Sequence, residues 1–231
     1  MTLPASAAAS GAGEPPLAVI TGGQGALARA LRRELTSQGW RVLAPAKAEL
    51  DVRDPSAVDA FFGNLTRLDL LINNAGIRRD APFSKQSADD WNAVMDTNLT
   101  GAWRCCRAAL PVMRRQGRGH MVNISSHTAR HGVAGQAAYG ASKAGLLALT
   151  QSLAAECGPD NIRVNAVLPG WMPTAFNENL PGPIHEAARL AHHLNRFNTP
   201  EHTARFIAFL HSMPMTSGQV FQLDSRPGSW M

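Results

Sequence analysis

The sequence predicts an α/β protein built on one parallel sheet that helices cover on both faces. From residue 17 onward, short and nearly continuous apolar runs alternate with amphipathic stretches of helical length. Strands inside a parallel sheet have this pattern, because neither of their faces meets water. The expected strands, about seven in number, are 17–20, 41–44, 50–52, 68–72, 120–124, 162–168 and 219–223.

The first strand, 17–20, runs into a glycine-containing turn, and a helix over 26–38 follows. The joint between the strands 41–44 and 50–52 is unusually short. A crossover between parallel strands normally needs about a dozen residues. We therefore expect no helix at this joint, and 50–52 should be a short stub at a thinly covered edge.

Composition and ends of the chain indicate a soluble, globular protein with a single domain over residues 17–231. Residues 1–16 are rich in Ala, Ser, Gly and Pro and lack the apolar core of a secretory signal, which predicts a disordered lead-in. No apolar run is long enough to span a bilayer, so we expect no membrane segment. Three cysteines without disulfide or metal-ligand spacing favour a reducing cytoplasm.

The chain is basic, with a formal net charge of +5. The basic residues are scattered, without a recognition helix or interleaved aromatic residues, so we expect no nucleic-acid binding. A basic surface also suits phosphate-bearing cofactors and acidic partners.

A phosphate-binding turn is predicted at Thr21-Gly22-Gly23-Gln24-Gly25-Ala26-Leu27-Ala28. It follows a strand and opens a helix, where glycines let the backbone approach a diphosphate that lies on free N–H groups. The alternative is an ordinary strand-to-helix turn. Ala26 and Ala28 stand where glycine would give the closest approach, and Ala26 is expected to crowd the diphosphate.

A phenol and an ammonium group are four positions apart at Tyr139 and Lys143, which places them on the same face of a helix. A nearby ammonium favours the phenolate and lowers the pKa of a tyrosine, which makes it a better acid–base group. Ser125 and Ser126 end the strand 120–124, at the edge where parallel sheets bind ligands. The spacing to Tyr139 favours Ser126 over Ser125 as the catalytic residue.

Taken together, these motifs resemble the short-chain dehydrogenase/reductase superfamily over nearly all of residues 19–224. The resemblance implies a Rossmann-type doubly wound sheet and an NAD(P)(H)-dependent oxidoreductase that interconverts a carbonyl and a secondary alcohol. The matching motifs are Thr21-Gly22, Asn73-Asn74-Ala75-Gly76, Thr97-Asn98-Leu99, Asn123-Ile124-Ser125-Ser126, Tyr139 with Lys143, Arg163-Val164-Asn165 and Pro169-Gly170.

The resemblance implies four catalytic residues. Ser126 hydrogen-bonds the substrate carbonyl, and Tyr139 donates or accepts the proton. Lys143 holds the nicotinamide ribose and lowers the pKa of Tyr139, and Asn98 anchors a water that links Lys143 to solvent.

The resemblance also implies the cofactor contacts. Asn74, Ala75 and Gly76 line the adenosine side, Asp51 and Val52 meet the adenine edge, and Thr174 bonds the carboxamide. The complete expected set is Thr21, Gly22, Gly23, Gln24, Gly25, Ala26, Leu27, Lys47, Asp51, Val52, Asn74, Ala75, Gly76, Tyr139, Lys143, Pro169, Gly170 and Thr174. Besides Ala26 and Ala28, the chain departs from the family in the missing crossover helix and in Ser225-Arg226, where paired glycines are usual.

The stretch Ala44-Pro45-Ala46-Lys47 contains no acidic residue to hold a ribose hydroxyl and has one cation, which favours NADP(H) over NAD(H). Residues 73–80, 135–139 and 196–201 resemble the 3-oxoacyl-carrier-protein reductase branch. The substrate is then a small ketone or a thioester of an acyl-carrier protein or CoA. Residues 114–118 are either a carrier-docking patch or a solvated helix end.

A substrate lid is expected over 175–195, with His185, His192 and His193 giving it polarity. The spacing of these histidines does not suggest a metal site. His127 and His131 either read a polar substrate group or lie in a surface loop. The helices 102–113 and 138–157 have broad apolar faces, which predicts a homodimer or homotetramer.

The sequence is compatible with two functional classes. One is the enzyme just described. The other is a non-catalytic binding or cofactor-sensing protein with the same fold and a weakened cofactor site. Ala26, the missing helix and the altered C-terminus favour the second class, and the complete set of Asn98, Ser126, Tyr139 and Lys143 favours the enzyme.

Overall fold

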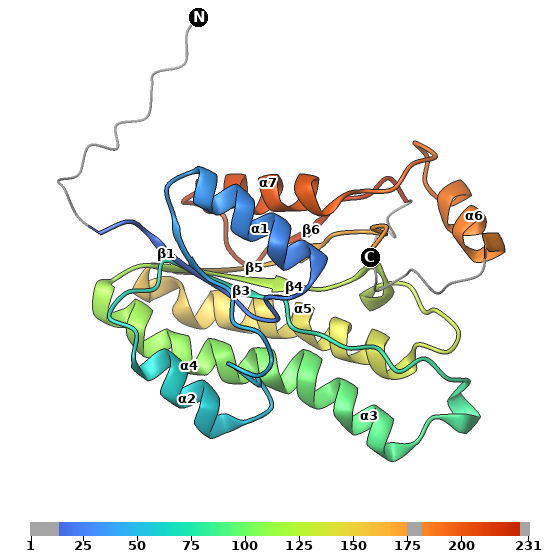
Figure 1. Cartoon of the computed structure of the whole chain (residues 1–231), viewed down its shortest axis with the longest axis horizontal. Coiled ribbons are helices and arrows are strands. Elements are labelled where there is room, and N and C mark those ends of the chain that lie inside the picture. The colour runs from blue at the N-terminus through green and yellow to red at the C-terminus, as the bar shows by residue number, and fades with distance from the viewer. Residues whose placement is uncertain (1–13, 175–181, 227–231) are drawn as a thin grey trace, which may run out of the picture.

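Parallel strands form one sheet in the order β2-β1-β3-β4-β5-β6 (Figure 1). This computed structural model describes residues 14–174 and 182–226 of the chain, and within them the sheet has six strands. The strands are β1 (Leu17–Ile20), β2 (Arg41–Leu43), β3 (Leu70–Asn73), β4 (Gly119–Ile124), β5 (Ile162–Leu168) and β6 (Val220–Gln222). The chain runs outward from β1 to β2 and then returns across β1 to β3, so the strand order reverses next to β1.

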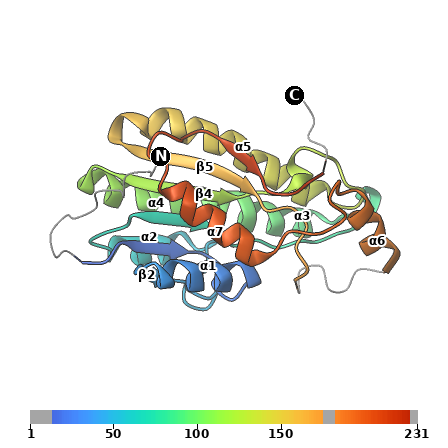
Figure 2. The same cartoon turned by 90° about the horizontal axis from the view of Figure 1, so that it is seen from above.

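Helices cover both faces of the sheet (Figures 1 and 2). On one face α1 (Ala26–Ser37) packs beside α7 (Pro200–His211), and the other face carries α2 (Pro55–Gly63), α4 (Gly101–Gln116) and α5 (Ala137–Cys157). The helix α3 (Ala88–Met95) packs against α5, and α6 (Gly182–Leu190) stands apart, beyond the carboxyl ends of the strands. The predicted fold class is confirmed: a doubly wound parallel sheet with two hydrophobic layers.

Local sequence explains where several helices begin and end. The Asp54 side chain accepts hydrogen bonds from the N–H groups of Ser56 and Ala57, and Pro55 occupies the first helical position of α2. Thr199 and Pro200 start α7 in the same way. The helix α4 ends at Gly117, whose φ of 66° is accessible to glycine at little cost.

The prediction of a strand at 50–52 is wrong, which is why the sheet has six strands rather than about seven. Leu50 and Val52 are buried in the core, but Asp51 accepts a 3.0 Å hydrogen bond from the backbone N–H of Arg53. Such a local bond competes with a strand ladder. As expected, no helix lies between β2 and this segment, so the sheet ends at β2.

The predicted lead-in, 1–16, lies outside the described residues except for 14–16, and the first part of the predicted lid, 175–181, also lies outside them. The rest of the lid, 182–195, contains α6 and the turn that follows it. Across the described part of the chain, no helix is both long and apolar enough to cross a membrane.

Candidate active site

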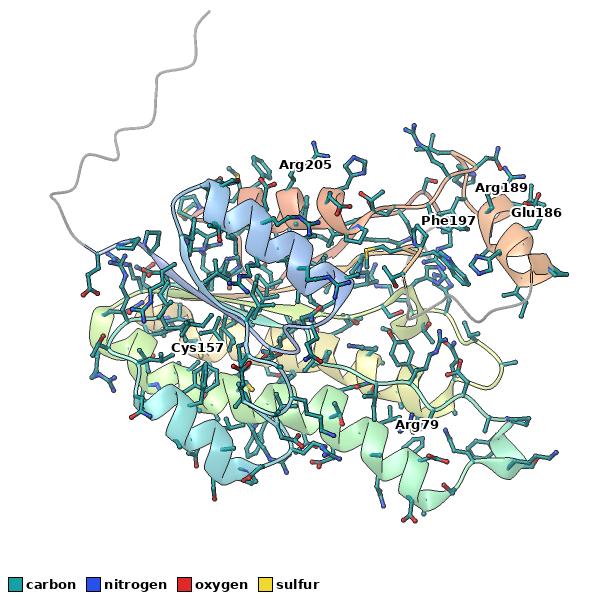
Figure 3. All side chains as sticks on the ribbon, in the orientation of Figure 1. Arg79, Cys157, Glu186, Arg189, Phe197 and Arg205 are labelled. Carbon is teal, nitrogen blue, oxygen red and sulfur yellow. The ribbon has the colours of Figure 1, made fainter. Side chains whose placement is uncertain are left out.

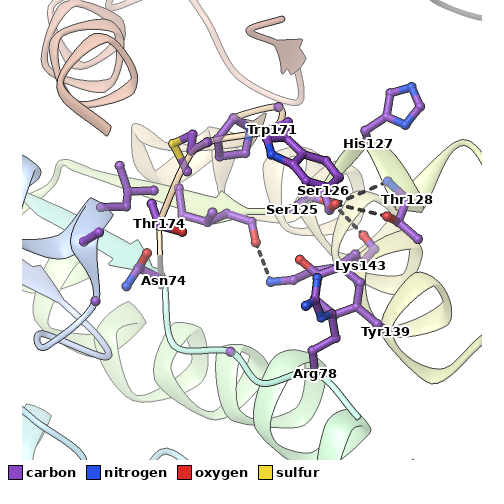
Figure 4. A pocket seen from close by; sticks show the side chains of 18 of the residues that line it. Asn74, Arg78, Ser125, Ser126, His127, Thr128, Tyr139, Lys143, Trp171 and Thr174 are labelled. Atoms are coloured by element: carbon purple, nitrogen blue, oxygen red, sulfur yellow. Dashed lines mark hydrogen bonds between the residues drawn. The ribbon is translucent and has the colours of Figure 1, made fainter. Parts of the chain in front are cut away.

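A cavity of about 380 Å³ opens at the carboxyl edge of the sheet. Its walls come from the segments that directly follow β1, β3, β4 and β5, together with the start of α5 and the end of the described chain (Figure 4). In doubly wound sheets, ligands bind at this edge, where the strand order reverses. Of the predicted site residues, the lining includes Gly22, Gly25, Ala26, Leu27, Asn74, Ala75, Gly76, Ser126, Tyr139, Lys143, Pro169, Gly170 and Thr174.

Thr21 fixes the turn after β1 to the segment after β3. Its buried hydroxyl accepts hydrogen bonds from the N–H groups of Asn74 and Ala75, both at 3.0 Å. The Asn74 side chain returns a 3.0 Å bond to the Thr21 carbonyl oxygen. Thr21 does not line the cavity, so its effect on a ligand passes through the position of these two segments.

Two glycines of this turn are required by close packing. Gly22 has a φ of 68°, and a Cβ there would lie 2.9 Å from the Ala75 Cα. A Cβ at Gly23 would lie 1.9 Å from the Ala44 carbonyl oxygen, so Gly23 is pressed against the end of β2 and faces away from the cavity. Gln24 is also absent from the lining, and its carbonyl oxygen accepts a hydrogen bond from Arg29.

The amino end of α1 faces the cavity without a side-chain cap. Gly25 is the N-cap residue, and a Cβ on it would meet nothing closer than 3.5 Å. The unpaired N–H groups of a helix start attract a phosphate, so this end fits the diphosphate of a nucleotide cofactor. Ala26 forms part of the wall, and the cavity remains open beside it.

The three residues predicted on the adenine side do not line the cavity. Lys47 is exposed on the loop after β2, and Asp51 forms an ion pair with Arg53 at 2.6 Å. This pair lowers the pKa of Asp51 to about 2, mainly through the hydrogen bond from Arg53. Val52 is buried, and a Cβ on Gly101 would lie only 2.6 Å from its Cγ2. Their contact with a cofactor stays a prediction.

The two serines after β4 have different partners. The Ser125 hydroxyl is buried and donates a 2.8 Å hydrogen bond to the carbonyl oxygen of Lys143, which ties β4 to α5. The Ser126 hydroxyl hydrogen-bonds Tyr139 and accepts a 3.2 Å bond from the N–H of Thr128 (Figure 4). The geometry therefore agrees with the choice of Ser126 over Ser125.

The pKa of Tyr139 is raised above its ordinary value, opposite to the predicted direction. Loss of water around the ring is the largest cause and outweighs the hydrogen bond from Ser126 and the positive charge of Arg78, which both lower the pKa. The Lys143 ammonium lies 5.8 Å from the centre of the Tyr139 ring and donates a 2.8 Å hydrogen bond to the Ile124 carbonyl oxygen.

Lys143 and Asn98 meet behind Gly76. Burial lowers the pKa of Lys143 to about 8. A Cβ on Gly76 would lie 3.3 Å from the Asn98 Oδ1 and 3.5 Å from the Lys143 Nζ, so the two side chains flank one small space. Asn98 itself is buried in the π-helical turn before α4 and exchanges hydrogen bonds of 2.8 and 3.0 Å with the backbone of Ile77.

Comparison with known proteins decides the family. A family model described as enoyl-(acyl carrier protein) reductase, of the short-chain dehydrogenase/reductase type, matches residues 8–225. The chain belongs to the short-chain dehydrogenase/reductase family. It is therefore an NAD(P)(H)-dependent oxidoreductase.

Relatives of the chain are similar over nearly their whole length. The 3-oxoacyl-(acyl-carrier-protein) reductase FabG of Thermotoga maritima is 35% identical over 91% of this chain and 97% of its own length. Acetoacetyl-CoA reductase of Shinella zoogloeoides is 34% identical over 85% of this chain and 90% of its own length. The solved structure "ElxO with NADP Bound" has a TM-score of 0.85 and 25% identity, covering 91% of this chain and 98% of that chain.

In this short-chain dehydrogenase/reductase, the cavity also contains residues that the sequence motifs did not select. Arg78, Trp171 and Arg226 line it. Arg78 lies two residues after the matched motif at 73–76, and Arg226 occupies a position where the family usually has glycine. That departure from the family pattern was the available signal for Arg226.

The candidate histidines lie in the cavity lining and in the lid segment. His127 lines the cavity and stacks on His131 with ring centres 4.1 Å apart. In the lid, His185 contacts Trp171 edge-on and His192 is buried. Among the described residues, no group of three His, Cys, Asp or Glu side chains could hold a metal ion.

The basic stretch 114–118 lies at the end of the sheet opposite the cavity. It directly precedes Gly119, the first residue of β4, whereas the cavity lies after the last residue of that strand. Arg114 forms a 2.7 Å ion pair with Asp160, and Arg118 lies 3.5 Å from Asp69. This location and these pairs favour the alternative that 114–118 is a solvated helix end.

Proposed function

We propose that this chain is an NADPH-dependent reductase that converts a 3-oxoacyl thioester, carried by an acyl-carrier protein or CoA, into the 3-hydroxyacyl thioester. The proposal rests on the hydrogen bond between Ser126 and Tyr139 at the carboxyl end of β4, with Lys143 one helical turn further along α5. Relatives named 3-oxoacyl-(acyl-carrier-protein) reductase and acetoacetyl-CoA reductase support the substrate class.

In the proposed reaction, the bound cofactor supplies a hydride to the keto carbon. Ser126 donates a hydrogen bond to the keto oxygen and holds it beside Tyr139. Tyr139 gives its phenolic proton to that oxygen as negative charge develops there, which leaves a secondary alcohol and a phenolate. The raised pKa keeps the proton on Tyr139 until this step.

Lys143 and Asn98 support the proton transfer in this proposal. Lys143, whose pKa is about 8, is mostly protonated at neutral pH, and its positive charge stabilises the phenolate that Tyr139 becomes. We assign Asn98 the role of positioning Lys143, because both side chains flank Gly76.

The residues present suit the diphosphate and the nicotinamide end of a dinucleotide cofactor. The open amino end of α1 suits the diphosphate, and Thr174, after the turn at Pro169-Gly170, is proposed to hold the carboxamide. NADP(H) is preferred in this proposal because Lys47 is exposed on the loop after β2. Glu49, the acid that is closest to Lys47 in the sequence, accepts a 2.7 Å hydrogen bond from the N–H of Ala46.

The test is the consumption of NADPH by the purified chain with acetoacetyl-CoA as the probe substrate. We expect turnover with NADPH that exceeds turnover with NADH, and loss of turnover in Tyr139→Phe while NADPH still binds. Crotonyl-CoA, an enoyl thioester, belongs in the same assay because of the description of the family model. Reduction of crotonyl-CoA alone, or of neither thioester, would refute the proposal.

We further propose a homodimer or homotetramer and a cytoplasmic location. The outer face of α4 includes Trp103, which is 42% exposed, and α5 exposes Ala141 and Ala148. Cys105, Cys106 and Cys157 are free and buried, as suits a reducing compartment. A monomer in sedimentation equilibrium would contradict the proposed assembly.

A further inference from the structure

The Arg and Lys side chains of the cavity wall have no acidic counterpart among the described residues of that wall. Arg78, Lys143 and Arg226 all line the cavity, and none of the described residues in its lining is an aspartate or a glutamate. Lys143 and Arg78 lie close to Tyr139, where the reaction takes place (Figure 4). Arg226 belongs to the wall that includes Trp171 and His127, and the proposed reaction gives it no task.

A buried carboxylate holds Arg226 in place. The Nε of Arg226 donates a 2.7 Å hydrogen bond to the Oδ2 of Asp224, whose side chain is 0% exposed. Asp224 also accepts a 2.8 Å bond from the Gln222 side chain. A Cβ on Gly170 would lie 2.5 Å from the Asp224 Cβ, so the carboxylate fits tightly beneath the turn after β5. Arg226 is therefore held by this buried carboxylate and also belongs to the cavity lining.

Within this ion pair, Arg226 acts more strongly than Asp224 on a neighbouring residue of the cavity wall. His127 lines the cavity, and its pKa is lowered to about 4, first by burial and next by the charge of Arg226. Asp224 acts on His127 in the opposite direction but more weakly. At His127, the positive charge of Arg226 therefore outweighs the negative charge of Asp224.

A second donor in the same wall has no hydrogen-bond partner among the residues that the structure describes. The indole of Trp171 lines the cavity, and its Nε1 is buried without a hydrogen bond to any described residue. A buried N–H group without an acceptor costs free energy, so a site that leaves one open is suited to a ligand that brings an acceptor. Arg226 and Trp171 thus both offer N–H donors, and donors suit an oxygen-rich, negatively charged group.

We propose that Arg226 is a specificity-determining residue that binds a carboxylate of the substrate, so that the enzyme also reduces free 3-oxo acids and prefers them to their neutral esters. The planar guanidinium matches a carboxylate geometrically. This inference rests on the proposed function, because it concerns the substrate of the same site. The carbonyl of a thioester would occupy the same place with a weaker, uncharged hydrogen bond.

The test compares acetoacetate with methyl acetoacetate, which differ in the charge of one group. Binding is measured by calorimetry in the presence of NADP⁺, which allows no reduction, and kcat/KM is measured with NADPH. In the wild-type enzyme we expect acetoacetate to bind more tightly than the ester. Arg226→Gly should weaken the binding of acetoacetate by roughly ten- to a hundredfold and should lower kcat/KM for acetoacetate at least tenfold more than for the ester.

Two further variants make the result specific. Arg226→Lys keeps the positive charge but loses the planar guanidinium, and we expect its acetoacetate binding to lie between that of the wild type and that of Arg226→Gly. Arg205→Gln removes the same charge from the outer side of α7, where Arg205 points away from the sheet (Figure 3), and should leave the preference unchanged. Equal binding of acid and ester by the wild-type enzyme, or an equal loss of both in Arg226→Gly, would overturn the inference.

The two proposals can fail separately. If acetoacetate binds in a manner that depends on Arg226 but no ketone is reduced, the proposed function is wrong and the carboxylate site stands. If acetoacetyl-CoA is reduced but acetoacetate binds no better than its ester, the carboxylate site is wrong and the proposed function stands.

Discussion

The hydroxyl of Ser125 lies 2.8 Å from the carbonyl oxygen of Lys143 and donates a hydrogen bond to it. This bond ties the end of β4 to the helix that carries both Tyr139 and Lys143. Because Ser125 is engaged there, the adjacent Ser126 is the serine that hydrogen-bonds Tyr139. Two neighbouring serines with the same chemistry thus have separate structural tasks.

Replacing each serine by alanine should separate these tasks. Ser126→Ala removes a group that binds the keto oxygen, and we expect kcat to fall about a hundredfold with little change in stability. Ser125→Ala removes a buried hydrogen bond and should lower the free energy of unfolding by about 1 kcal/mol. Steady-state kinetics and chemical denaturation measure both effects. A larger loss of kcat in Ser125→Ala than in Ser126→Ala would contradict this assignment.

The ionisation of Tyr139 can be observed directly, since it is the only tyrosine of the chain. Burial raises its pKa above the ordinary value of 10, so tyrosinate absorbance should appear only at higher pH than in a free tyrosine. Arg78 lowers this pKa, so Arg78→Ala should move the transition to still higher pH. A midpoint below 10 in the wild-type protein would show that Lys143 outweighs burial.

Lys143 should make stability depend on pH in a predictable direction. Its pKa falls from 10.5 to about 8 on folding, because the ammonium is buried. Between these values the unfolded chain binds more protons than the folded chain, so the contribution of Lys143 to stability rises with pH over this window. Below about pH 8 the folded protein bears the full cost of the buried charge.

Lys143→Met should therefore unfold at a higher temperature than the wild type at pH 7, and this advantage should shrink as the pH approaches 10.5. The difference in the free energy of unfolding is at most roughly 3 kcal/mol. Thermal denaturation of both proteins across the window measures it. A constant difference across the window would contradict the lowered pKa of Lys143.

A matched pair of glycine substitutions tests the turn after β1. Gly23→Ala places a Cβ 1.9 Å from the Ala44 carbonyl oxygen, which forces the backbone to move. Gly25→Ala meets no atom closer than 3.5 Å. We expect Gly23→Ala to lower the free energy of unfolding by about 2 kcal/mol or more and to weaken NADPH binding, with Gly25→Ala milder in both. Denaturation and fluorescence titration measure these effects, and equal losses in both variants would contradict the packing argument.

The sequence by itself determined the fold class, because continuous apolar runs that alternate with helical stretches are compatible with few architectures. It also selected Ser126, Tyr139 and Lys143, since each falls at a position fixed by its own element. Ser126 comes just after a strand, and the other two lie one helical turn apart. The structure brings these three together at one cavity.

The tertiary structure decided what depends on neighbours distant in the sequence. The stretch 50–52 has apolar residues at alternate positions, like a strand, but it pairs with no strand in the described part of the chain; Leu50 and Val52 are buried in the core instead, where Val52 lies against Gly101. The pKa of Tyr139 rises instead of falling, because burial outweighs charge, and burial is a property of the whole fold. Arg226 belongs to the cavity lining, and its guanidinium is held by Asp224, which is buried beneath Gly170.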